Sequence, residues 1–128
     1  MQTKKQNQKI ILHACTKADW QKAQKDQEYK VSSLDSEGFI HCSEADTIIG
    51  VANSHWKGRL DLVLLIIDSV KVKSEIKYEL DPKGGKIYPH IYGPLNLDAV
   101  IKVKDFLPNS NGIFDKSSLS FLKTKTAV

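Results

Sequence analysis

The chain has 128 residues, of which 41% are hydrophobic and 27% are charged, proportions typical of a globular protein. A chain of that length can bury a core within one domain without disulfides or metals. Its longest apolar run, residues 62–67, is far below the roughly 18 residues of a membrane span, which argues against a transmembrane protein. Residues 1–9 are polar and lead into no secretion signal, and the two cysteines fit no zinc-binding spacing. We therefore expect a cytoplasmic protein with free thiols.

The net charge of +4 is concentrated at the two ends of the chain. Residues 1–10 contribute +3 and residues 111–128 contribute +2, so residues 11–110 carry a net charge of −1. A nucleic-acid interface would need basic residues grouped on folded elements, and it would favour arginine for binding phosphate. Arg59 is the single arginine. We expect solvated basic tails and no nucleic-acid partner.

Strands predominate among the elements predicted in chain order. Residues 9–15 are apolar and rich in isoleucine, which predicts a first strand. Thr16 and Asp19 then have the spacing of a capping box, which opens a helix that ends near residue 26. Apolar or alternating residues predict further strands over 38–43, 60–68, 75–80, 86–94 and 99–107.

Two of these strands carry further information. Residues 60–68 are almost continuously apolar, which predicts a strand buried on both faces. Pro89 confines the strand at 86–94 to an edge or to an irregular course. The whole pattern predicts an α+β fold, with a polar basic tail at 1–9, a single domain at 10–107 and a frayed C-terminal extension at 108–128.

The motif GFIHCS, residues 38–43, places three reactive side chains beside a predicted helix. In a strand, Phe39, His41 and Ser43 share one face and Ile40 and Cys42 share the other. Ser43 begins an S-x-x-D capping signal, and we expect it to cap the following helix. The N-terminus of a helix also suits an anion or a ribose, and His41 would face such a ligand. The two interpretations of this junction are compatible.

Two further histidines lie on predicted strands. His13 interrupts an apolar strand, which indicates either a hydrogen-bonded core histidine or a ligand-binding group. His90 alternates with Tyr92, which indicates either an exposed aromatic edge or part of a site. Histidines on three extended segments favour one pocket lined by His13, His41, Ser43, His90 and Tyr92. Because no HxH, HxxxH, HExxH or GxSxG motif occurs, we expect neither a metal site nor a serine hydrolase.

The order of the segments LHAC, GFIHCS, VLLIID and PHIYGP resembles the bacterial domain-of-unknown-function family nine-five-two, over roughly residues 10–107. Its members have no established activity. The first three segments are also distantly similar to the RNA 2′-phosphotransferases, which have the ADP-ribosyltransferase-like fold. That resemblance implies a split β-sheet with a few short helices around an NAD cleft. It gives His13 the role of holding the nicotinamide nucleotide, and it maps His41 and Ser43 onto the second histidine and the serine of an H-x-H-L-S motif.

The chain departs from those enzymes in its catalytic groups. It has one arginine where the phosphotransferases use several, and it lacks the E-x-E pair of the arginine-modifying toxins. Glu79 is the best candidate for a catalytic carboxylate, which would stabilise positive charge developing at an anomeric carbon. The alternative is an exposed strand residue beside Lys77.

Two functions stay open. The first is a protein that binds NAD, ADP-ribose or a related nucleotide, as a binder or as an ADP-ribosyl- or phosphotransferase. The second is a non-catalytic domain that retains the cleft to bind a small metabolite or a partner. We expect no resident cofactor, with NAD as a ligand or substrate, and no membrane partner. The oligomeric state does not follow from the sequence.

Overall fold

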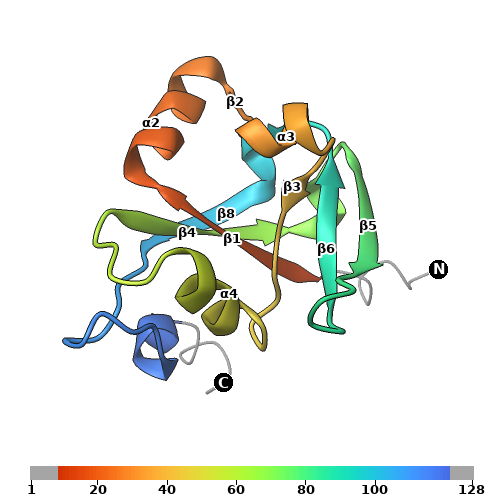
Figure 1. Cartoon of the computed structure of the whole chain (residues 1–128). Helices are drawn as coiled ribbons and strands as arrows, with labels where there is room; N and C mark the ends of the chain where they lie inside the picture. The colour runs from red at the N-terminus through yellow and green to blue at the C-terminus, as the bar shows by residue number, and fades with distance from the viewer. Residues whose placement is uncertain (1–8, 122–128) are drawn as a thin grey trace.

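The computed structural model describes residues 9–121 and confirms an α+β architecture (Figure 1). Within these residues, eight strands form three antiparallel sheets. The strands are β1 (Ile10–Thr16), β2 (Glu28–Tyr29), β3 (Ile40–His41), β4 (Leu62–Asp68), β5 (Glu75–Leu80), β6 (Ile87–Tyr92), β7 (Leu95–Asn96) and β8 (Val100–Asp105). The α-helices are α2 (Lys17–Asp26), α3 (Ser32–Ser36) and α4 (Ile48–His55), and the 3-10 helices are η1 (Ser69–Lys71), η2 (Leu97–Ala99) and η3 (Lys116–Leu119). Most of the predicted basic tail and the last part of the predicted extension lie outside the described residues.

The first sheet, with strand order β1-β4-β8, forms the centre of the molecule. Its middle strand β4 is buried along its whole length, as its continuous apolar sequence predicts. Alternate residues enter two separate cores, with Leu65 in the first core and Leu64 in the second. On β1, Ile11 and Cys15 belong to the first core. His13, midway between them, therefore points to the same side of the sheet.

The second core lies between the first sheet, α4 and the chain that follows β8. Phe106 and Phe114 are buried there and stack with ring centres 4.8 Å apart. Asn53 of α4 donates its side-chain amide to the carbonyl of Phe114 (2.9 Å) and accepts from its N–H (2.8 Å). The described part of the predicted extension, residues 108–121, thus packs against the body of the protein. Figure 1 shows α4 and this segment on the side of the first sheet away from α2 and α3.

The second sheet has the order β3-β6-β5, so β6 is its central strand. Of the two alternatives expected of a strand that contains Pro89, an edge position or an irregular course, the edge position is wrong. The Pro89 carbonyl accepts from the N–H of Cys42 (3.0 Å), so the backbone polar atoms of Pro89 face β3. β3 has only two residues and ends at His41, so its hydrogen-bond ladder with β6 ends beside Pro89. The N–H that Pro89 lacks would face β3, and its absence therefore breaks no further pairing.

A short bridge joins the first and second sheets. The N–H of Leu12 donates to the carbonyl of Ser43 (2.7 Å), and the N–H of Ser43 donates to the carbonyl of Leu12 (2.8 Å). The sheet surface is thus divided into two three-stranded parts that meet at this point. The small β2-β7 pair forms a third sheet and contributes Tyr29 and Leu95 to the first core.

The two predicted helix caps have different outcomes. Thr16 caps α2 by accepting from the N–H of Asp19 (3.1 Å), as predicted. Ser43 does not cap α4, because that helix begins only at Ile48 and its N-cap residue Thr47 makes no side-chain capping bond. The backbone of Ser43 is engaged in the bridge between the sheets, and a turn separates it from the helix.

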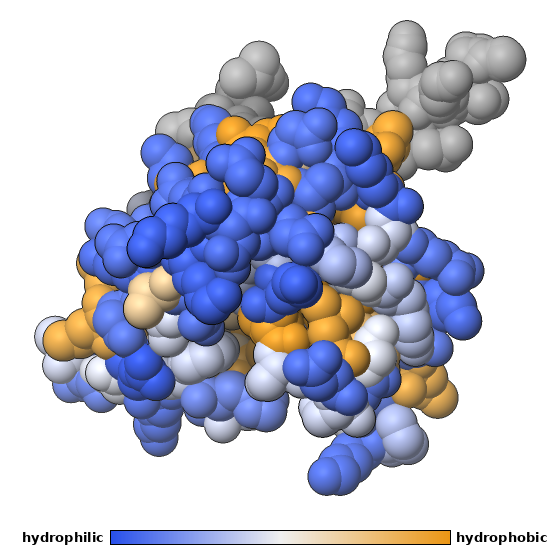
Figure 2. Space-filling model, turned by 90° about the horizontal axis from the view of Figure 1, so that it is seen from above, coloured by the Kyte–Doolittle hydropathy of each residue, from blue (hydrophilic) through white to orange (hydrophobic). Residues whose placement is uncertain are grey.

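The surface seen from above in Figure 2 is largely polar, with apolar side chains in separate patches. Large apolar side chains that are well exposed include Leu60, Leu80 and Ile87. None of the helices within residues 9–121 has the length and hydrophobicity that crossing a bilayer requires.

Candidate functional site

The register of the second sheet brings the polar residues of the candidate site onto one face. His41 of β3 pairs with His90 of β6, and His90 pairs with Lys77 of β5. Directly paired residues in an antiparallel sheet project to the same side, as do residues two positions apart. His41, His90, Tyr92 and Glu79 therefore share this face. The imidazoles of His41 and His90 have ring centres 5.3 Å apart.

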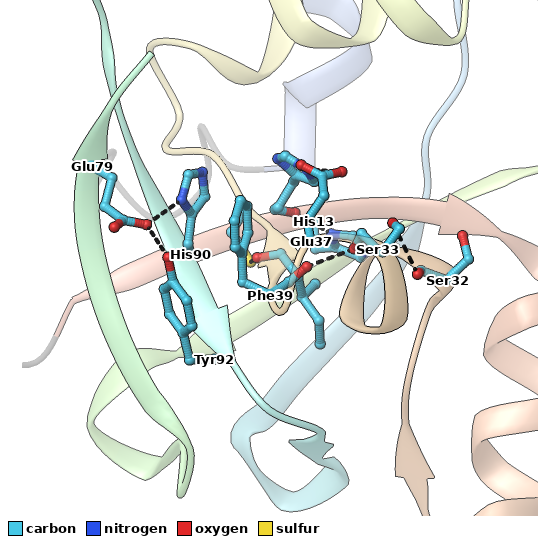
Figure 3. Close-up of polar contacts among 12 residues, drawn as sticks. His13, Ser32, Ser33, Glu37, Phe39, Glu79, His90 and Tyr92 are labelled. Atoms are coloured by element: carbon cyan, nitrogen blue, oxygen red, sulfur yellow. Dashed lines mark hydrogen bonds and ion pairs between the residues drawn. The ribbon is translucent and has the colours of Figure 1, made fainter. Parts of the chain in front are cut away.

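Glu79 is the centre of a hydrogen-bonded group (Figure 3). Its Oε1 atom accepts from the Tyr92 hydroxyl (2.6 Å) and from Nδ1 of His90 (2.7 Å). The hydrogen bond from Tyr92, and then that from His90, lowers the pKa of Glu79 below its ordinary value. The hydrogen bond to Glu79 in turn raises the pKa of the Tyr92 hydroxyl. The Glu79 side chain is 37% exposed and also accepts hydrogen bonds from two neighbouring side chains.

Phe39 covers His90. Their rings stack with centres 4.0 Å apart and planes 18° apart, and the Phe39 ring also lies 5.2 Å from that of Tyr92. The loop before β3 sets this position. Ser33 of α3 donates its hydroxyl to the Phe39 carbonyl (2.6 Å), as Figure 3 shows, and Gly38 has a φ of +90°, which glycine adopts without strain.

His41 forms the exposed side of the site. Its side chain is 53% exposed, and its Nε2 atom lies 3.1 Å and 3.2 Å from the two carboxylate oxygens of Glu37. Its ring also meets the ring of Phe39 edge-on, with centres 4.8 Å apart. Two histidines on this face thus each have a carboxylate partner of their own.

His13 lies beneath His41 and is engaged at both ring nitrogens. Its Nδ1 atom is 2.5 Å from the His41 carbonyl, and its Nε2 atom is 2.7 Å from the Tyr29 hydroxyl. Burial lowers the pKa of His13 from 6.5 to about 4, so the ring is neutral at pH 7. A carbonyl only accepts, so Nδ1 carries the proton and Nε2 accepts from Tyr29. Burial also raises the pKa of the Tyr29 phenol, which keeps that donor protonated.

The structure therefore brings His13, His41 and His90 together, but in different roles. His41 and His90 present their rings on one face, while His13 holds the backbone of His41 from behind. Tyr92 lies on the same face and donates its hydroxyl to Glu79. Ser43 is only 3% exposed and is paired with β1, so its side chain does not lie on the open face with His41.

The two cysteines do not form a second reactive centre. Cys15 and Cys42 are buried, and burial raises the pKa of both thiols, that of Cys15 to about 12. Such thiols are poor nucleophiles at neutral pH. Among residues 9–121 no group of three or more His, Cys, Asp or Glu side chains is arranged to hold a metal ion.

The sequence interpretation missed three residues of this arrangement. The strand pattern puts Phe39 on the same face as His41, and this alternation is the signal that could have identified Phe39 as a site residue. Glu37 lies four residues before His41, and its contact depends on a loop conformation that no periodicity predicts. Tyr29 belongs to a two-residue strand, which is too short to leave a pattern.

Comparison with known proteins identifies the family. The family model described as "Protein of unknown function (DUF952)" matches residues 14–103. The chain belongs to this DUF952 family. The matched residues include the whole open face of the site, whereas His13 lies just before them.

Solved structures of one protein have a similar fold. The crystal structure of CC0527 from Caulobacter crescentus matches with a TM-score of 0.77 and 24% identity, covering 93% of this chain and 99% of that one. A double mutant of CC0527 gives the same values. The solution NMR structure of CC0527 matches with a TM-score of 0.72 and 25% identity over 83% of this chain and 91% of that one. No curated protein matches the chain.

Proposed function

We propose that this DUF952 protein binds NAD, ADP-ribose or a related nucleotide on the face formed by Phe39, His41, Glu79, His90 and Tyr92. The observation that carries the proposal is the arrangement around Glu79, where one carboxylate holds an imidazole and a phenol in place beneath a stacked aromatic ring. Aromatic faces with a few fixed polar groups are typical of small-molecule sites. His41, with about half of its side chain exposed, is accessible to such a ligand.

The division of the β-structure supports the same proposal. Two three-stranded antiparallel sheets meet at one bridge between Leu12 and Ser43. A split sheet of this kind is what the resemblance to the ADP-ribosyltransferase-like fold implies. The residues of the proposed site belong to the second sheet and to the loop before it, and His13 links them to the first sheet. Fold similarity alone does not establish chemistry, so the proposal depends on the site.

Glu79 is the group best placed for a transfer reaction. In cleavage of a glycosidic bond, a carboxylate stabilises the positive charge that develops at the anomeric carbon. The lowered pKa of Glu79 keeps it ionised at neutral pH, as that role requires. Its Oε1 atom is engaged by Tyr92 and His90, so these two residues would orient the carboxylate toward the ligand.

One observation favours binding without catalysis. Arg59, the single arginine, is paired with Asp61 through two hydrogen bonds of 2.9 Å and 2.7 Å at the start of β4. Arg59 also lies over the Trp56 ring, so its guanidinium is engaged with residues outside the second sheet and is not available on that face to neutralise a transferring phosphate. The non-catalytic alternative is a domain that binds the nucleotide and does not cleave it.

The proposal is tested by measuring thermal stability and binding heat with NAD and ADP-ribose. A ligand present at a hundredfold excess over its Kd stabilises the native state by about 2.7 kcal/mol. We expect such stabilisation in the wild type and a weakened response in His41→Gln and Phe39→Leu. His55→Gln, which changes an exposed histidine at the end of α4, is the matched control. Analysis of the incubated ligand for cleavage distinguishes transferase from binder. Absence of any response to either ligand at millimolar concentration would refute the proposal.

A further inference from the structure

The hydrogen-bond partners of the two site histidines determine which ring nitrogens carry protons. The ionised carboxylate of Glu79 only accepts, so Nδ1 of His90 must be the protonated nitrogen. By the same reasoning, Nε2 of His41 donates to the carboxylate of Glu37. In their neutral forms the two rings therefore leave one lone pair each, at Nε2 of His90 and at Nδ1 of His41.

Both lone pairs are available to a ligand. Within residues 9–121 neither nitrogen has a hydrogen-bond partner. The side chain of His90 is 14% exposed and that of His41 is 53% exposed. The two imidazoles are neighbours on one face, with ring centres 5.3 Å apart and planes 79° apart.

The charges around this pair select the kind of ligand group that fits. Glu37 and Glu79 place two carboxylates directly on the two rings. Lys77 is a cation on the same face, and its Nζ atom lies 4.7 Å from the centre of the Tyr92 ring. A phosphate would meet lone pairs and negative charge, which is unfavourable. A pair of hydroxyl groups would instead donate to the two nitrogens over ordinary distances of about 2.7–3.0 Å.

We propose that His41 and His90 act together as acceptors for two neighbouring hydroxyl groups, the 2′- and 3′-hydroxyls of a ribose. The inference rests on the proposed nucleotide function and specifies which part of the ligand this face recognises. The phosphates of the ligand lie away from the two imidazoles. Glu37 and Glu79 are positioning residues here, because they act by fixing the proton on the opposite nitrogen of each ring.

The protonation pattern is measured directly on the free protein. Long-range proton–nitrogen NMR correlations at mildly alkaline pH separate imidazoles protonated at Nδ1 from those protonated at Nε2. We expect His90 to carry its proton on Nδ1 and His41 to carry its proton on Nε2. In Glu79→Leu, His90 should become a mixture of tautomers while His41 is unchanged. The opposite pattern in the wild type would overturn the inference without any ligand.

The recognition of hydroxyl pairs is tested by titrating the wild type with adenosine and with nicotinamide riboside. Each is compared with its 2′-deoxy and 3′-deoxy forms. We expect removal of either hydroxyl to weaken binding by about tenfold. In His41→Phe and His90→Phe this penalty should shrink for the hydroxyl that has lost its acceptor, whereas His55→Gln should retain it. Equal affinities for ribose and deoxyribose forms would overturn the inference and leave nucleotide binding intact. If neither the nucleosides nor NAD and ADP-ribose bind, the proposed function fails and this inference fails with it.

Discussion

The neutral state of His13 makes a prediction about stability in weak acid. In the unfolded chain this histidine takes up a proton near its ordinary pKa of 6.5, whereas in the folded protein it does so only near 4. Between these values the unfolded state binds more protons, so acid favours unfolding and stability rises with pH. The stabilisation from neutral His13 is present above pH 6.5 and is lost as the pH falls toward 4.

The size of the effect follows from the two pKa values. Linkage between proton binding and folding gives a loss of about 2 kcal/mol between pH 7 and pH 5 from this one group. The interval lies above the ordinary pKa of carboxylates such as Glu79, whose own pKa is lowered, so they contribute little to it. Comparison of the wild type with a variant changed only at His13 isolates the contribution of this group.

The assay is urea unfolding of the wild type, His13→Gln and the control His55→Gln at pH 7 and pH 5. We expect His13→Gln to be less stable at pH 7, because glutamine does not reproduce both hydrogen bonds of the ring. Its free energy of unfolding should also change by about 2 kcal/mol less between the two pH values than that of the wild type. His55→Gln should keep the pH dependence of the wild type. If His13→Gln keeps it too, His13 is not held neutral in the folded protein and the reasoning is refuted.

Three further substitutions test the backbone and the group around Glu79. Gly93→Ala should destabilise the protein by about 1–3 kcal/mol in thermal unfolding, since Gly93 has a φ of +144° and an added Cβ would lie 2.6 Å from Oγ of Ser74. Gly50→Ala, in α4 with open space around the added Cβ, should instead stabilise by about 0.5–1 kcal/mol, and a loss of stability there would contradict the helix assignment. Tyr92→Phe should raise the pKa of Glu79 toward its ordinary value, because the Tyr92 hydroxyl is the largest cause of the lowered pKa. Carbon NMR of the Glu79 carboxyl measures this, and an unchanged titration would show that the hydrogen bond is absent in solution.

The elements that periodicity governs were predictable from the sequence. The continuous apolar run of β4 and the alternation of β5 appear in the structure with nearly the predicted bounds. The cap at Thr16 was equally local, since it depends on residues three positions apart. Ser43 had the same local signal, but a partner from a distant strand took its backbone groups. A local sequence pattern does not show that pairing with Leu12 competes with capping of the helix.

The candidate site was predictable in its residue types and not in its connections. Three histidines on extended segments indicated a common location, and the structure brings them together. The contact between Glu79 and His90 depends on the register of β5 against β6, which a turn of several residues sets. The stacking of Phe39 on His90 depends on a loop held by Ser33. Long-range pairings of this kind have no signature in a single sequence.

Three of the five residues of the open face come from one short segment of the chain, and this has a consequence for how the family can diverge. Glu79, His90 and Tyr92 all belong to one β-hairpin, and their side chains contact one another through hydrogen bonds to Glu79. The buried strand β4 belongs to the other sheet and contributes to both cores, and the first core also contains Ile40 and Ile91 of the second sheet. Glu79, His90 and Tyr92 alternate with Ile91 and other residues that face the opposite side, and they belong to neither core. Substitutions at these three positions would therefore change the open face without removing a residue of either core, and this face can diverge within the family while the cores are kept.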